Sequence, residues 1–134
     1  MIDLSNIYVI TEMQLKKVRN DGELEDLAAG EIVAPIQMPG GTFIRNLKIM
    51  LNQREIYDSN QLYSYKVYMD TEFSYPTTVK DAYLSASGYH REKENPNRVA
   101  DEGYVARKNA FASSKTVQFI HKLSADLLNQ DLYL

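Results

Sequence analysis

The stretch from Ala34 to Tyr68 constrains the fold of this 134-residue chain more than any other part. It reads as an extended segment, a turn at Pro39-Gly40-Gly41, a hairpin with its tip at Asn52-Gln53, and the start of an aromatic helix. The first strand of the hairpin runs from Phe43 to Leu51, and the second returns from Arg54 to Tyr57. This order predicts a β scaffold that carries a helical insertion between its strands.

Alternating apolar residues predict two further strands, one near each end of the chain. Residues 6–18 carry one apolar set on the odd positions, and residues 115–123 alternate in the same way, which is typical of half-buried strands. The segment Glu31 to Ile36 also reads as extended, and Pro35 confines it to a sheet edge, a strand end or a bulge. Between these segments, Leu24 to Gly30 is expected to form a short helical turn or a loop.

Two helices are expected in the insertion, which covers about residues 61–88. The first runs from Gln61 to Ser74, and the residue before Pro76 ends it. The second runs from Val79 to Ser87, with Gly88 as its C-terminal stop. The apolar residues that predict the first helix recur at spacings of three and four, and they are Leu62, Tyr65, Met69 and Phe73.

The interval that follows, about residues 89–113, is rich in charged and polar residues and shows no apolar period. We expect it to be a long exposed loop. The whole chain, residues 1–134, has the length of a single domain.

Composition excludes several classes of function. The net charge of −3 lacks the basic footprint that nucleic-acid binding requires, so no nucleic-acid partner is expected. The absence of cysteine removes disulfides and cysteine-ligated zinc, as in proteins of reducing compartments. The N-terminus shows no secretion signal, and no apolar run approaches the length of a membrane span. These features predict a soluble, non-secreted protein with no membrane partner, inside the cell.

The titratable residues do not form a catalytic or metal-binding pattern. His90 and His121 stand apart from any triad or metal-ligand motif, and we expect both to be structural. The carboxylates around the insertion are better explained as a solvated helix surface; they are Asp58, Asp70, Glu72 and Asp81. Gly40-Gly41 lacks the lysine and the further glycine of a phosphate loop. The sequence therefore predicts no enzyme, no cofactor and no metal.

The ten tyrosines are the clearest compositional anomaly. Tyrosine joins a large apolar ring to a polar hydroxyl, which suits contacts that are buried but partly wet. The rings of the insertion either cover the open end of the sheet within one subunit or contact another subunit. The candidate interface residues are Tyr63, Tyr65, Tyr68, Phe73, Tyr75 and Tyr83.

Several segments resemble the major capsid proteins of Maverick or Polinton elements and related capsid-like proteins of animal genomes. The segments are API at 34–36, FIRNLKIMLNQREI at 43–56, YSYKVYMDTEFSY at 63–75, DAYLSASGY at 81–89 and SKTVQFIHKLSADLLNQD at 114–131. They follow one another in the same order as in that family. Each is a structural pattern, and none is a catalytic signature.

The resemblance implies a double jelly-roll capsid subunit, three of which form a capsomer. This chain is long enough for only one incomplete jelly roll, without its first and last strands, and its apolar end at 131–134 reads as a strand or connection cut in mid-course. We therefore expect a mainly β, antiparallel jelly-roll-type sandwich with a helical insertion. Its predicted function is a self-assembling viral or virus-derived capsid structural protein, in a homo-oligomer such as a trimer or with a chain that completes the sheet.

Two alternatives remain open. A host-domesticated, capsid-derived module could bind a protein partner by strand addition at an exposed sheet edge, without capsid assembly. A small hydrolase would instead need a pocket that holds Asp70, Glu72 or Asp81 with strongly shifted pKa values, and we expect no such pocket.

Overall fold

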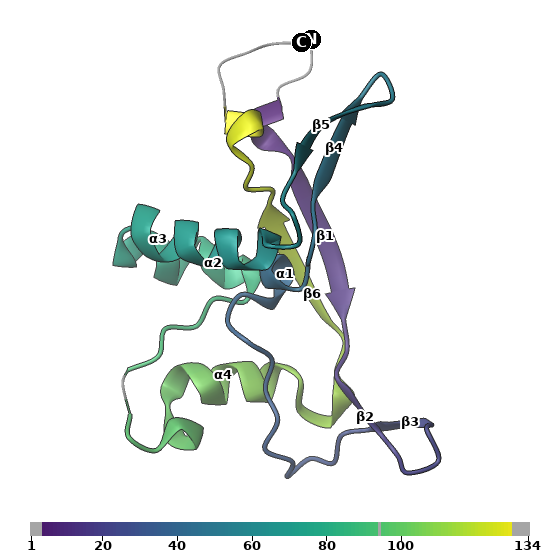
Figure 1. Cartoon of the computed structure of the whole chain (residues 1–134). Helices are drawn as coiled ribbons and strands as arrows, with labels where there is room; N and C mark the ends of the chain where they lie inside the picture. Colours follow the sequence, from purple (N-terminus) through teal and green to yellow (C-terminus); the bar gives the residue numbers. More distant parts are fainter. Residues whose placement is uncertain (1–3, 94, 130–134) are drawn as a thin grey trace.

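A computed structural model describes residues 4–93 and 95–129 (Figure 1). The strands are β1 (Tyr8–Met13), β2 (Lys16–Val18), β3 (Leu24–Asp26), β4 (Lys48–Leu51), β5 (Arg54–Asp58) and β6 (Val117–Lys122). The α-helices are α1 (Pro39–Thr42), α2 (Tyr63–Ser74), α3 (Thr77–Ala82) and α4 (Glu102–Ala110). Short 3-10 turns are η1 (Leu4–Asn6), η2 (Leu84–Ser87), η3 (Arg98–Ala100), η4 (Ala112–Ser114) and η5 (Asp126–Asn129).

The described strands form three separate two-stranded ribbons, which pair β1 with β6, β2 with β3, and β4 with β5. The structure is 37% helical and only 22% strand. The prediction of a mainly β, jelly-roll-type sandwich is therefore wrong. Segments that were expected to widen the sheet are instead helix or coil, so no ribbon among the described residues gains a third strand.

The longest ribbon joins the two ends of the described chain. β1 and β6 run antiparallel, and Tyr8 pairs with Lys122 while Met13 pairs with Val117. The predicted alternation is confirmed, because the odd-numbered residues of both strands are the less exposed ones. Helices α2, α3 and α4 all lie on one side of this ribbon (Figure 1).

The predicted hairpin is present but shorter than expected. β4 and β5 are joined at Asn52-Gln53, and both tip residues have positive φ, 49° and 65°, as a type I′ turn requires. The strand does not begin at Phe43. The preceding residues form the buried helix α1, where a strand-to-strand turn was expected.

Two glycines explain why α1 packs so closely on β6. A Cβ atom on Gly40 would lie 2.7 Å from the Cβ of Phe119, and one on Gly41 would lie 2.6 Å from the His121 ring. Only glycine permits this approach of a helix backbone to the strand. The Pro39-Gly40-Gly41 sequence therefore belongs to a closely packed helix. Proline and glycine are also typical of reverse turns, so the sequence alone does not distinguish the two structures.

Helix α2 ends as predicted, because Tyr75 before Pro76 is extended. The apolar residues whose spacing predicted the helix do not form its packed face. The buried residues are Tyr63, Val67 and Thr71, at spacings of four. Since the helix carries apolar residues on more than one face, the periodicity does not decide which face packs inward.

The second predicted helix is divided into α3 and the turn η2. Gly88 follows with φ 83°, and its predicted role as the C-terminal stop is confirmed. The segment expected to be a helical turn or loop after Leu24 instead begins with β3, which pairs with β2 across the Asp21-Gly22 turn.

The polar interval at 89–113 is not a continuous exposed loop. It contains η3, helix α4 and the start of η4. Asp101 caps α4 by accepting a hydrogen bond of 2.9 Å from the Gly103 N–H. The helix buries an arginine instead of an apolar stripe, so a search for apolar periodicity could not find it.

The core lies where α1 packs between α2 and β6. It is built from Met38, Tyr63, Val67 and Tyr89, with partly buried apolar side chains around them. A second contact joins α4 to β6 through Phe111 and Phe119, whose ring centroids lie 5.9 Å apart. The core holds the inner face of α2 and leaves its outer face to solvent.

Candidate interaction site

The structure separates the six predicted interface residues into one core residue and five surface residues. Tyr63 is fully buried, and its hydroxyl accepts a hydrogen bond of 3.0 Å from the Ser124 N–H. It therefore belongs to the core. The five exposed aromatic residues are Tyr65, Tyr68, Phe73, Tyr75 and Tyr83.

The outer face of α2 carries a continuous line of apolar side chains, which we call the outer stripe. It consists of Leu62, Tyr65, Met69 and Phe73, and these residues are between 50% and 79% exposed. They are the residues whose spacing predicted the helix. The spacing is helical, but the stripe faces away from the core, and contiguous exposed apolar surface is typical of an interaction site.

A cleft of about 790 Å³ lies beside the stripe, and we call it the tyrosine–arginine cleft. Side chains of α2, α3, η3 and α4 line it together with the segment from Ala34 to Gln37. Four tyrosines reach it from three parts of the chain, namely Tyr65, Tyr68, Tyr89 and Tyr104. Two of them, Tyr65 and Tyr68, were predicted as interface residues, and the other two were not.

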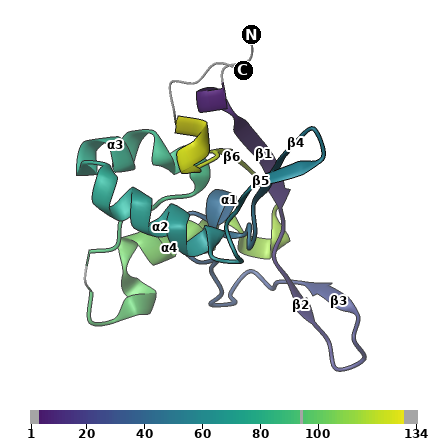
Figure 2. The ribbon, with the colours of Figure 1, turned by 45° about the horizontal axis from the view of Figure 1, so that its top comes forward.

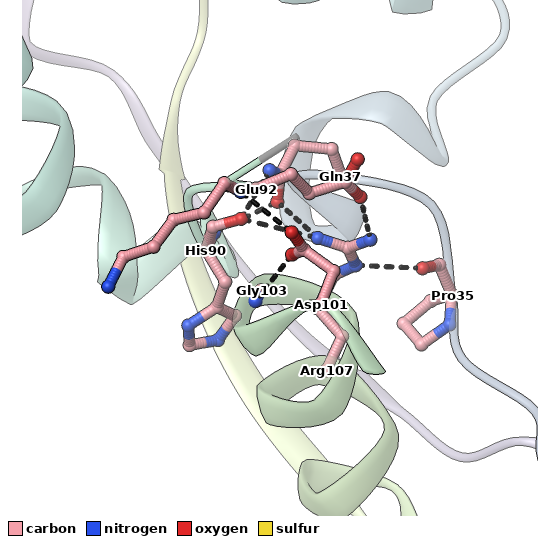
Figure 3. A network of polar contacts seen from close by, with 8 residues as sticks. Pro35, Gln37, His90, Glu92, Asp101, Gly103 and Arg107 are labelled. Carbon is pink, nitrogen blue, oxygen red and sulfur yellow. Dashed lines mark hydrogen bonds and ion pairs between the residues drawn. The ribbon is translucent and has the colours of Figure 1, made fainter. Parts of the chain in front are cut away.

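Arg107 from α4 holds one wall of the cleft together (Figure 3). It is only 4% exposed, and its Nε donates to the Pro35 carbonyl at 3.1 Å. Its Nη1 donates to the Gln37 side chain and to the His90 carbonyl, and its Nη2 lies 2.5 Å from Glu92 Oε1. The fork geometry of the guanidinium thus joins three chain segments at one point.

Asp101 fixes the start of α4 in the same region. Burial opposes ionisation of this carboxyl, but hydrogen bonds from the backbone N–H groups of Lys93, Gly103, Tyr104 and Asn95 outweigh it and lower the pKa of Asp101. The ionised Asp101 side chain holds the loop at Lys93 against the first turn of α4, because the Lys93 N–H donates to Asp101 Oδ2 at an N to O distance of 2.7 Å.

The opposite wall contains a largely buried lysine. Lys80 of α3 lies 2.6 Å from Glu72 Oε2 and also donates to the Glu72 carbonyl at 2.9 Å. Burial, together with the neighbouring Glu72 carboxylate, raises the pKa of Tyr89 to about 12. The Tyr89 phenol is therefore protonated at neutral pH and lies beside an ion pair that is already formed.

The charges of the cleft do not cancel. Its lining holds four cationic side chains and two carboxylates, a balance of +2. Glu72 is paired with Lys80, and Glu92 is paired with Arg107. Arg91 and Arg98 make no ion pair with any residue in the ranges 4–93 and 95–129. The cleft thus presents, among its tyrosine rings, two guanidinium groups that have no ion-pair partner within those ranges.

His121 lies in the interior and not in the cleft. It is 5% exposed, its Nδ1 is 3.4 Å from Ser87 Oγ, and its Nε2 has no hydrogen-bond partner in the described part of the chain. Burial lowers the pKa of His121 to about 4, so the ring is neutral. The Ser87 hydroxyl donates to the Ile120 carbonyl instead. This pair is therefore not arranged as a nucleophile and its base.

His90 is half-buried, and its contribution to the Arg107 network is its backbone carbonyl. Burial, with the nearby Arg107 charge, lowers the pKa of His90.

Three of the candidate carboxylates pair with lysines: Asp58 with Lys48, Asp70 with Lys66, and Glu72 with Lys80. The fourth, Asp81, is exposed. Only Glu72 lines the cleft.

Sequence reasoning missed the residues that shape this cleft, because most of them lie in the interval assigned to a loop. They are Tyr89, Arg91, Glu92, Arg98, Tyr104 and Arg107. One available signal was Asp101 followed by Glu102, which is typical of a helix N-terminus.

No group of three or more histidine, aspartate or glutamate side chains in the described part of the chain could hold a metal ion.

Comparisons with protein-family models, with curated proteins and with solved structures found no match to this chain. Within the described ranges, every helix is too short or too polar to cross a membrane.

Proposed function

We propose that this chain is a structural protein that acts by associating with further copies of itself, without catalysis. The outer stripe of α2 is the observation that carries this proposal. Residues at helical spacing are exposed together there, while the opposite face of the same helix is packed in the core. A monomer gains no stability from such a stripe, whereas a second copy would bury it.

The ribbons support the same proposal. On the outward face of the β1–β6 ribbon, Ile10 pairs with Ile120, and both are exposed, as is Tyr8. A two-stranded ribbon has an unpaired edge on each strand, and such edges pair readily with strands of other chains. The exposed apolar side chains and the unpaired strand edges together favour an oligomer over a monomer.

Assembly of the capsid type is the specific form that we propose, and its support is the resemblance of the hairpin and helix segments to Maverick and Polinton capsid proteins. The proposal concerns self-assembly and does not depend on a jelly roll. A trimer is the expected oligomer on the same basis, with a virion or intracellular location. The alternative role, a host-domesticated binding module, requires a different chain as the partner.

The stripe offers a closely matched test. Met69→Ser removes an apolar side chain from the stripe. Met50→Ser makes the same change on β4, outside the stripe, at a methionine of similar exposure. In sedimentation velocity at several concentrations, Met69→Ser and Phe73→Ser should shift the distribution toward monomer, while Met50→Ser should behave as wild type. If all three variants behave alike, association does not use the stripe and the proposal fails.

A further inference from the structure

We propose that the β2–β3 hairpin of one copy docks in the tyrosine–arginine cleft of a second copy. This inference rests on the self-association proposed above, and it names two surfaces that meet in the assembly. It concerns a contact separate from the outer stripe, although Tyr65 borders both.

The cleft is selective for an acidic partner because its own carboxylates are already used. Glu72 and Glu92 are held by Lys80 and Arg107, so they are not available to neutralise Arg91 and Arg98. These two arginines are exposed in the described structure. An occupant that brings carboxylates satisfies them, and arginine forms paired hydrogen bonds with a carboxylate.

The β2–β3 hairpin has the complementary character. Its acidic residues outnumber its basic ones by one: Asp21, Glu23, Glu25 and Asp26 against Lys16, Lys17 and Arg19. It also exposes an apolar cross-strand pair, because Val18 lies opposite Leu24 and the two are 68% and 66% exposed. The hairpin thus has an acidic tip with two aliphatic side chains behind it. The carboxylates would meet the arginines of the cleft, and the aliphatic side chains would meet its tyrosine rings.

The acidic groups at the tip are available for a new partner. Arg19 lies 3.8 Å from Asp21 and 3.6 Å from Glu25, and all three side chains are about half exposed. Exposed pairs at such distances contribute little to stability. Glu23 makes no ion pair with a described residue. Asp21 accepts a hydrogen bond of 3.1 Å from the Glu23 N–H through Oδ1, so its second oxygen, Oδ2, and the Glu23 carboxylate are the groups that can meet the arginines of another copy.

The arrangement of the elements makes this contact intermolecular. The hairpin projects from the body on the side away from α2 and α3, in the two views of Figures 1 and 2. A hairpin of one copy in the cleft of the next is a head-to-tail contact, which generates a ring or an open chain. The cleft volume of about 790 Å³ is within the ~300–1,000 Å³ that is typical of ligand-binding clefts, so the cleft has room for side chains of the hairpin tip.

Charge reversal tests the inference on the intact chain. Sedimentation velocity would compare wild type with Arg91→Glu/Arg98→Glu, with Asp21→Lys/Glu23→Lys, and with the protein that carries all four changes. Each pair of reversals alone should weaken association by about tenfold or more, because like charges then meet. All four together should restore it. Arg54→Glu and Glu55→Lys, on the other hairpin, are the matched controls and should have little effect.

Mixing the two double variants gives a second, sharper readout. The cleft variant retains an intact hairpin, and the hairpin variant retains an intact cleft, so the mixture should form more complex than either variant alone. Thermal unfolding of each variant checks that it folds. If one does not, the milder Arg98→Gln and Glu23→Gln replace it, and each should still weaken association.

Two results would overturn the inference while leaving the proposed function in place. One is association that none of the reversals changes. The other is loss of association in the cleft variant with no effect of the hairpin reversal and no rescue, which would mean that the cleft takes a different partner. A wild-type chain that stays monomeric would instead contradict the proposed function itself.

Discussion

Arg107 connects parts of the chain that are far apart in sequence, because its guanidinium bonds to the segment at 35–37 and to that at 90–92. Removing it would take away the donor to the Pro35 carbonyl and leave Glu92 without its partner, while the His90 carbonyl would keep the hydrogen bond from the Gln37 side-chain amide. We expect Arg107→Ala to lower the free energy of unfolding by about 3 kcal/mol.

Arg107→Lys is the control for that effect. Lysine keeps the positive charge but cannot reproduce the forked hydrogen bonds of the guanidinium. The free energy of unfolding of Arg107→Lys should therefore lie between those of wild type and Arg107→Ala. Urea unfolding of the three proteins measures the difference. Equal stability of wild type and Arg107→Ala would show that the network does not hold the cleft wall.

His121 gives the chain a stability that depends on pH. Its pKa is about 4 in the folded protein and about 6.5 when unfolded, so the unfolded state binds more protons between these values. Stability should therefore fall as the pH falls from 6.5 to 4, by about 3 kcal/mol in total for this residue.

The His121→Gln variant isolates this contribution, because the carboxyl groups, Asp101 among them, titrate equally in both proteins. Urea unfolding at pH 7 and pH 4.5 should show a larger decrease for wild type than for the variant. The same decrease in both proteins would mean that the buried imidazole is not neutral in the fold.

At the scale of the elements, α1 depends on its close approach to β6. Gly41→Ala would place a methyl group 2.6 Å from the His121 ring, so a shift of the backbone or ring is required. We expect a loss of roughly 1–3 kcal/mol, as for other overpacked sites. Gly30→Ala is the matched control, because no atom lies within 4 Å of its added carbon. A thermal melt that shows equal effects would contradict this packing.

The tip of the β4–β5 hairpin offers a stabilising change. Gln53 has φ 65°, a conformation that glycine adopts without a steric penalty, and Asn-Gly is the favoured sequence of a type I′ turn. Gln53→Gly should raise stability by up to about 1 kcal/mol in urea unfolding. A decrease instead would show that the tip does not hold this turn.

Sequence patterns predicted local structure where one residue type determines the backbone. Asn52-Gln53 at the hairpin tip, the end of α2 before Pro76 and the stop at Gly88 are all confirmed. The alternation in β1 and β6 is confirmed as well, since a ribbon with one packed face needs only a period of two.

The failures have a common physical origin, which is that the deciding contacts are distant in sequence. The inner face of α2 is set by contacts such as Tyr63 with Ser124, and α4 is positioned by Arg107 and Asp101. Neither depends on an apolar period. The jelly roll was expected from the resemblance to capsid proteins, whereas pairing in the described residues stops at two strands. The strand or connection predicted at 131–134 lies outside the described residues.

At the scale of the whole molecule, the helices, ribbons and hairpins present surfaces that a single copy does not use. The outer stripe of α2, the outward face of the β1–β6 ribbon and the projecting β2–β3 hairpin all expose apolar side chains. Single exposed apolar residues are ordinary, but their alignment along named elements favours association between copies.

Light scattering of the purified wild-type chain across a concentration series measures this association without any substitution. Self-association predicts a weight-average mass that rises above 15.4 kDa with concentration and approaches a multiple of that mass. Raising the salt concentration should weaken the part of the association that depends on the arginine cleft, because salt screens exposed charges. A constant mass of one chain at every concentration would show that the copies do not associate.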